Sequence, residues 1–204
     1  GAGASGRDAL AVASLHKLQL QLAAWAINKI GMPPKLNAKF ESWAAPLATA
    51  LLCAARGSDG TISDTDLELH RLLRRKLLRC LRQPEAPQQD HASHRVLALR
   101  CLRLQLPLLA STKAVSKENL EAVEQLFGGK AMHLELSRER DAVPVSRRYD
   151  ELLEAHASVA LSMASARFEW VVQRLILPAL RGDGSNKRLG HPSVLALATL
   201  RRLL

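Results

Sequence analysis

Aromatic residues are scarce in this sequence, at 3% of its 204 residues. The seven are Trp25, Phe40, Trp43, Phe127, Tyr149, Phe168 and Trp170. Strands are enriched in aromatic and β-branched residues, so a sheet protein of this size would be expected to carry more of them. Leu, Ala and Arg recur instead, and these are strong helix formers. The composition therefore predicts helices rather than sheets.

Long apolar runs and a secretory leader are also missing. No stretch of about 18 apolar residues is free of charge, and residues 1–30 lack the segments of a signal peptide. We therefore expect no membrane partner and no secretion. The Gly/Ala/Ser run at residues 1–6 reads as a leftover of cloning, and the chain ends within an apolar pattern at Leu204. Both features lead us to expect a fragment of a larger protein.

Cysteine is limited to three residues, Cys53, Cys80 and Cys101. An odd number cannot pair completely within one chain, and each residue lies among apolar residues at helical spacing. We interpret them as buried thiols in a reducing compartment, which predicts an intracellular protein, either nuclear or cytoplasmic.

The familiar motifs of catalytic centres are absent. The sequence has no Gly-x-Ser-x-Gly elbow, no Walker loop and no His-Glu-x-x-His helix. His91 and His94 lie between Cys80 and Cys101, but their spacing fits no standard zinc module. Core thiols and loop histidines are the better interpretation. We expect no enzyme activity, no metal, no cofactor and no small-molecule substrate.

Apolar residues recur at helical spacing from residue 8 to residue 30, which predicts the first helix. They are Leu10, Val12, Leu15, Leu18, Leu22, Trp25, Ala26 and Ile30. A second helix is expected from a cap at Asn37 to about Arg56. Pro46 lies inside it, so we expect a kink or a break near Ala45.

Two further helices follow. Ser63 and Asp66 stand three residues apart and form a variant capping box, which opens a helix ending near Gln83. The next helix begins near residue 90 or 93 and continues past Leu106, where Pro107 is expected to interrupt it.

The C-terminal part is predicted to contain three helices. Ser116 caps a short helix that a glycine pair ends after residue 127. Ser146 caps a long helix that Pro178 bends or ends, and Pro192 suits the first turn of a last helix. The pattern of residues 130–145 does not decide between a strand, a helix and an ordered loop.

About seven helices with short polar connections leave helix-on-helix packing as the only arrangement. We predict an all-α fold in which residues 7–204 form a single domain of stacked antiparallel hairpins or an irregular bundle. Prolines inside helices, Ala-rich faces and paired long helices resemble the HEAT and armadillo class of α-solenoids. The resemblance implies a protein-binding scaffold and assigns no individual functional residue.

The chain is basic, with 29 Lys and Arg against 19 Asp and Glu, for a formal net charge of +10. The candidate residues for an anionic partner are Arg71, Arg75, Arg79, Arg82, Arg100 and Arg103. The first four fall on one side of a helix, opposite Leu73 and Leu77. Guanidinium groups suit phosphates and carboxylates. The alternative, which we favour, is a solvated face paired with acids such as Asp66 and Glu68.

Large aromatic side chains offer the other candidate site. Trp25, Trp43 and Trp170, together with Phe168, can anchor a partner, because aromatic residues dominate interface hot spots. They are equally the bulky residues available to fill an Ala/Leu core, and we favour the core for each of them.

Our leading hypothesis is a helical-repeat interaction module, the scaffold subunit of an intracellular complex, which binds another protein and suits an acidic one. The alternative is a nucleic-acid-binding subunit that uses the basic helical face. No aromatic residue lies between Trp43 and Phe127, which argues against single strands but not against duplex phosphates. The composition also permits an effector domain of a bacterium or parasite.

Overall fold

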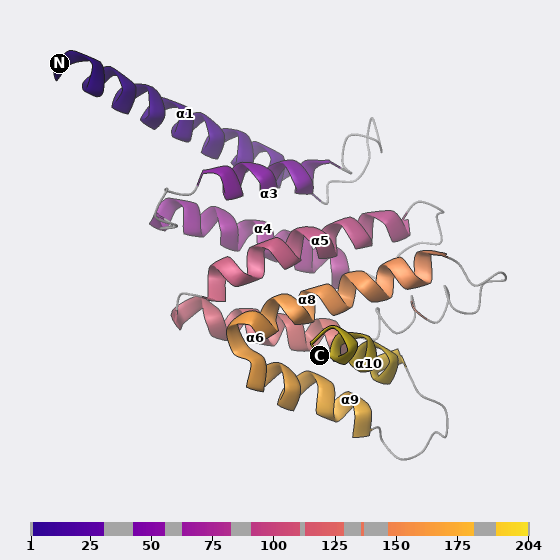
Figure 1. Cartoon of the computed structure of the whole chain (residues 1–204). Coiled ribbons are helices and arrows are strands. Elements are labelled where there is room, and N and C mark those ends of the chain that lie inside the picture. Colours follow the sequence, from indigo (N-terminus) through magenta and orange to yellow (C-terminus); the bar gives the residue numbers. More distant parts are fainter. Residues whose placement is uncertain are drawn as a thin grey trace. The chain divides into compact units, whose positions relative to one another are not determined.

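The computed structural model describes residues 2–30, 43–55, 63–82, 91–110, 113–128, 136, 147–181 and 191–203. Apart from single residues at helix ends, all of these are helical and none lies in a strand, so the all-α prediction is confirmed. The elements are α1 (Ala2–Lys29), α3 (Ala44–Ala54), α4 (Asp64–Arg82), α5 (His91–Ala110), α6 (Lys113–Gly128), α8 (Arg147–Val171), the π-helix η1 (Val172–Ile176), α9 (Leu177–Arg181) and α10 (His191–Leu203) (Figure 1). Among these helices none is both long and apolar enough to cross a membrane.

The chain forms two compact units, Gly1–Lys76 and Leu77–Leu204. The division falls inside α4, so the first unit comprises α1, α3 and the larger part of α4. The second unit holds the last turns of α4 and the remaining helices. A single domain over residues 7–204 stays a prediction, and so does the choice between stacked hairpins and an irregular bundle.

In the first unit α1 packs against α3 through small side chains. Ala23, Ala26 and Ile27 of α1 are fully buried, and Ala48 and Leu52 are buried on α3. Helix axes approach most closely where the side chains at the contact are small. The Ala-rich sides of α1 and α3 therefore form the contact between these two helices, and the sequence had indicated Ala-rich helix faces.

The two packed helices differ greatly in length. α1 has 28 residues and α3 has 11. At 1.5 Å per residue these are about 42 Å and about 17 Å long. Figure 1 shows the N-terminal half of α1 extending past the end of α3. Only the C-terminal half of α1 is therefore covered by α3.

Helix starts follow local chemistry. α3 begins at Ala44, next to the break predicted near Ala45, and Pro46 sits in its first turn, where a missing N–H costs little. The Asp66 N–H donates to Ser63 Oγ at 3.2 Å, as the capping box predicted.

One predicted helix cap is wrong. α6 begins at Lys113, so Ser116 lies in its first turn instead of capping it. The predicted caps Asn37 and Ser146 lie outside the described residues.

The second unit is organised around the contact between α5 and α8. α6 packs on both of these helices, and α10 packs on α8 and α9. The largest fully buried apolar side chains of the two central helices are Leu99, Leu102, Leu106, Leu152 and Met163, and the polar Gln105 and His156 are buried among them. Of residues 130–145 only Leu136 is described, and it is helical and buried. The core is thus aliphatic, as the composition predicted.

Pro107 does not interrupt α5, which continues to Ala110. A proline has no N–H, so Pro107 cannot donate to the carbonyl oxygen of Arg103 one turn earlier. The Ser162 hydroxyl of α8 donates to that oxygen instead, at 2.8 Å. The predicted interruption is therefore wrong, because a side chain on the neighbouring helix replaces the missing donor.

Pro178 does not end the long helix either. The Leu177 N–H donates to the carbonyl oxygen of Val172, five residues back, and the chain then continues as α9 to Arg181. A π turn is wider than an α turn. The extra width gives the pyrrolidine ring room in the turn before it, where an α-helix would bring a clash.

The backbone departs from helical geometry instead at Arg167 of α8, with φ −148° and ψ 59°. Within the preceding turn the Ser165 hydroxyl donates to the carbonyl oxygen of Ser162 at 2.7 Å. Such side-chain bonds to the backbone compete with the helical ladder and bend helices. The kink was not predicted, since the segment holds no proline or glycine.

The role of the Ser162 hydroxyl, which replaces the N–H that Pro107 lacks, can be tested by a double-mutant cycle. Ser162→Ala is expected to cost about 1 kcal/mol, because the Arg103 carbonyl loses its protein donor. In a Pro107→Ala background the helix supplies its own N–H, so the same change should cost less than about 0.5 kcal/mol. Urea unfolding followed by circular dichroism measures both costs. Equal losses in the two backgrounds would contradict this account.

Candidate interaction surface

An uncovered apolar stripe runs along α1. Its members are Leu15, Leu18, Leu22 and Trp25, and their exposed fractions are 56%, 51%, 44% and 43%. The spacings of three, four and three residues place all four on one side of the helix. Their side differs from that of Ala23, Ala26 and Ile27, which face the core. We call these four residues the outer face of α1.

The outer face carries almost no charge. Lys17 is the one Lys, Arg, Asp or Glu between residues 9 and 28, and its helical position lies off the stripe. Leu10 and Val12 are also exposed, beyond the reach of α3. A contiguous exposed apolar stripe of this kind is typical of an interaction surface, and among the described residues Leu15 and Leu18 are each more than half exposed.

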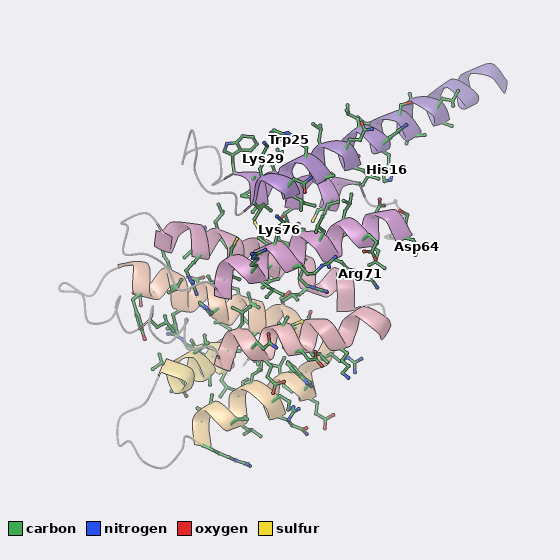
Figure 2. All side chains as sticks on the ribbon, turned by 180° about the vertical axis from the view of Figure 1, so that it is seen from behind. His16, Trp25, Lys29, Asp64, Arg71 and Lys76 are labelled. Atoms are coloured by element: carbon green, nitrogen blue, oxygen red, sulfur yellow. The ribbon has the colours of Figure 1, made fainter. Side chains whose placement is uncertain are left out.

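Two tryptophans extend the outer face at its C-terminal end. The rings of Trp25 and Trp43 lie 6.3 Å apart between centroids and are tilted by 41°. The Lys29 ammonium lies 5.9 Å from the Trp25 centroid, within cation–π range. Figure 2 shows Trp25 and Lys29 together near the end of α1. The ring pair joins the outer face to the start of α3.

The expectation that the aromatic residues fill the core is wrong for Trp25, Trp43 and Phe168, all of which are exposed. Trp170 is half-buried and belongs to the second unit. The exposure of Trp25 has a simple cause, because small alanines leave no space for an indole between α1 and α3. Trp25 and Trp43 are therefore available to a partner, which is the other use that the sequence suggested.

The predicted basic residues divide into two groups. The side chains of Arg75, Arg79, Arg100 and Arg103 are exposed, and within the described part of the chain none of them makes an ion pair. Arg71 is half-buried and pairs with Glu68, as the solvated-face interpretation expects. The side chain of Arg82 lies outside the description.

The division between the two units also separates these arginines. Arg71 and Arg75 belong to the first unit, while Arg79, Arg100 and Arg103 belong to the second. A single continuous basic surface therefore stays a prediction.

A buried polar row on α4 was missed from the sequence. Asp66, His70 and Arg74 are all at least 96% buried and follow one another at intervals of four residues. That interval puts them on one side of the helix and was the signal that could have identified them. Buried charges are retained in proteins when they are paired, so we interpret the row as structural.

The row also links two elements of the first unit. His16 Nε2 of α1 lies 3.6 Å from Asp66 Oδ1. Figure 2 shows His16 on the side of α1 nearest the start of α4. His16 lies on the side of α1 away from the outer face, so this contact does not cover the stripe.

A second buried arginine, Arg95 of α5, serves the end of α4. Its Nη2 donates to the Leu81 carbonyl oxygen at 2.9 Å. The last four carbonyls of a helix have no partner within it, and a cation there opposes the negative end of the helix dipole. Arg95 therefore acts as a helix cap and is not available for binding.

None of the three cysteines forms a disulfide bond. Cys101 is buried as predicted, whereas Cys53 and Cys80 are half-buried. Among the described residues no group of three or more His, Cys, Asp or Glu side chains could hold a metal ion. The side chains of His91 and His94 lie outside those residues.

The chain matches no protein-family model, no curated protein and no solved structure. The resemblance to HEAT and armadillo repeats stays a prediction.

Because one side of α1 is buried and the outer face is exposed, truncating a residue on each side should have different effects on the free energy of unfolding. Ile27→Ala should lower the free energy of unfolding by about 2 to 5 kcal/mol, because Ile27 is fully buried. Leu18→Ala should change it by less than about 0.5 kcal/mol in dilute protein, because Leu18 is half exposed. Urea titration of both variants checks this. Comparable losses would mean that Leu18 is a core residue.

Proposed function

We propose that this chain is a protein–protein interaction module that binds through the outer face of α1 and the adjoining Trp25–Trp43 pair. The observation that carries the proposal is the uncovered row of large apolar side chains along one side of α1. Contiguous exposed apolar surface on a folded protein marks an interaction site. Helices that present such a stripe are a common recognition element, laid into a groove or against another helix.

The residue types in this surface support the same conclusion. Tryptophan is enriched among the residues that dominate binding energy, and leucines around it exclude water. Trp25 and Trp43 stand side by side, and Lys29 adds a cation next to the ring of Trp25. A partner with an apolar strip and an acidic edge would match this arrangement. The role is one of binding rather than catalysis.

The wider setting is part of the proposal. A scaffold subunit of an intracellular complex, nuclear or cytoplasmic, agrees with three thiols that form no disulfide. A HEAT-like array would agree with the antiparallel packing of neighbouring helices.

The proposal is tested by binding with matched variants of α1. The immobilised chain should retain a discrete partner protein from cell extract, and Leu15→Gln, Leu18→Gln and Leu22→Gln in one chain should remove it by deleting the apolar contact. Ala13→Gln, on the opposite and exposed side of the same half of α1, is the control and should leave retention unchanged. Partner retention that is unaffected by the triple change would defeat the proposal.

A second candidate function is binding of an acidic protein or nucleic acid by the exposed arginines. It is favoured by the side chains of Arg75, Arg79, Arg100 and Arg103, which make no ion pair within the described residues. Arg71, by contrast, pairs with Glu68. Phosphate contacts need no aromatic residues.

This second function predicts a position-specific charge effect. Arg75→Glu with Arg79→Glu should weaken binding to a DNA duplex by about tenfold or more at low salt, because two phosphate contacts are lost. Arg174→Glu with Arg201→Glu changes the net charge equally and should weaken binding much less. Fluorescence anisotropy across a salt titration measures both. Equal weakening in the two variants would show that net charge alone attracts the duplex.

A further inference from the structure

The spacing along the outer face of α1 is that of a helix-pairing seam. Leu15, Leu18, Leu22 and Trp25 follow intervals of three, four and three residues, which is the a/d repeat of two packed helices. The side chains at these positions are exposed over three successive turns. A seam of this kind is completed by another helix with the same spacing.

The exposed apolar area of this surface is comparable to the area that one partner buries in a protein–protein interface. A large side chain has an accessible area on the order of 200 Å². The outer face with Val12 at its flank and with Trp43 comprises six large side chains, exposed by about half on average. Together they present roughly 600 Å², of the same order as the roughly 800 Å² per partner of a standard interface.

The charge pattern favours a second copy of α1 in antiparallel orientation. In a parallel pair Lys29 would stand beside Lys29 of the other copy, at a cost in like-charge repulsion. In an antiparallel pair with Leu15 level with Leu22 of the other copy, Lys29 is level with position 8, an aspartate. The two Lys29 positions are then about 32 Å apart along the helices. No charged residue of α1 lies at the centre of this seam.

From these observations we infer that this surface is self-complementary: two copies of the chain pair through the outer faces of their α1 helices, antiparallel and about a twofold axis near Leu18. The inference rests on the proposed function and names the partner of that surface. A twofold pair uses the same patch on both copies, so one uncovered stripe is sufficient to close the assembly. Trp25 of each copy is then level with position 12 of the other along the helix axes.

Light scattering of the full chain provides the first measurement. The mass should rise from 22.3 kDa toward twice that value as the concentration increases through the micromolar range. Leu18→Glu and Leu18→Lys should each raise the dissociation constant about 100-fold or more, because like charges meet at the axis. An equimolar mixture of these two variants should restore the dimer. Ala13→Glu is the control and should dimerise like the unchanged chain.

Cross-linking then tests the orientation. A short amine-reactive cross-linker applied to mixed light and heavy isotope-labelled chains should join Lys17 of one copy to Lys17 of the other without joining the two Lys29 side chains. In the antiparallel pair the Lys17 positions differ by about 4.5 Å along the helices and the Lys29 positions by about 32 Å, whereas in a parallel pair both are level. A Lys29–Lys29 product between copies would contradict the antiparallel arrangement.

The outcomes separate this inference from the proposed function. A monomer at every concentration, a mixture that does not restore the dimer, or equal disruption by Ala13→Glu would overturn self-pairing. If the chain is monomeric while the Leu15, Leu18 and Leu22 triple variant still loses a retained partner, only the identity of the partner is refuted. If neither dimer nor retained partner depends on the outer face, both conclusions fail.

Discussion

The difference in length between α1 and the shorter helix α3 that covers it determines which apolar side chains of the first unit are buried. α1 offers apolar side chains on more than one side, but α3 has 11 residues and covers the alanine-rich side of its C-terminal half. Hydrophobic stabilisation scales with the apolar area removed from water, so the remaining leucines contribute little to folding. They gain that stabilisation only when another helix covers them. The proposed binding role rests on this unfinished burial.

The second unit keeps its helices continuous by replacing lost backbone hydrogen bonds locally. Ser162 donates to the carbonyl that Pro107 leaves without a donor, and η1 widens the helix before Pro178. Arg95 donates to a carbonyl at the end of α4. Backbone groups without a partner cost free energy, so the first two arrangements let a helix continue at a proline and the third satisfies a buried helix end. An extended α5–α8 contact is the result.

Sequence reasoning predicted the helices much better than it predicted their environment. The periodic leucines located α1, and Ser63 located the start of α4, because these depend on local backbone chemistry. The exposure of Leu18 depends instead on how far α3 extends along α1, and that of Trp25 on the close approach of the two helices, and both are matters of tertiary packing. Pro107 was misjudged for the same reason, since Ser162 on another helix compensates for it, and the continuation past Pro178 depends on a change of helix type that the sequence did not indicate. The four-residue spacing from Asp66 to Arg74 indicated that these polar residues share one side of α4. It was not recognised as a buried row, because other arginines of the same helix are exposed.

Hydrogen exchange along α1, measured by mass spectrometry at low and high protein concentration, tests the central claim most directly. If the N-terminal half of α1 is covered only by a second molecule, amides of residues 9–22 will exchange more slowly as the concentration rises, while those of residues 91–110 in α5 will not change. Slow and concentration-independent exchange over residues 9–22 would show that the chain covers its own stripe, and would contradict the account.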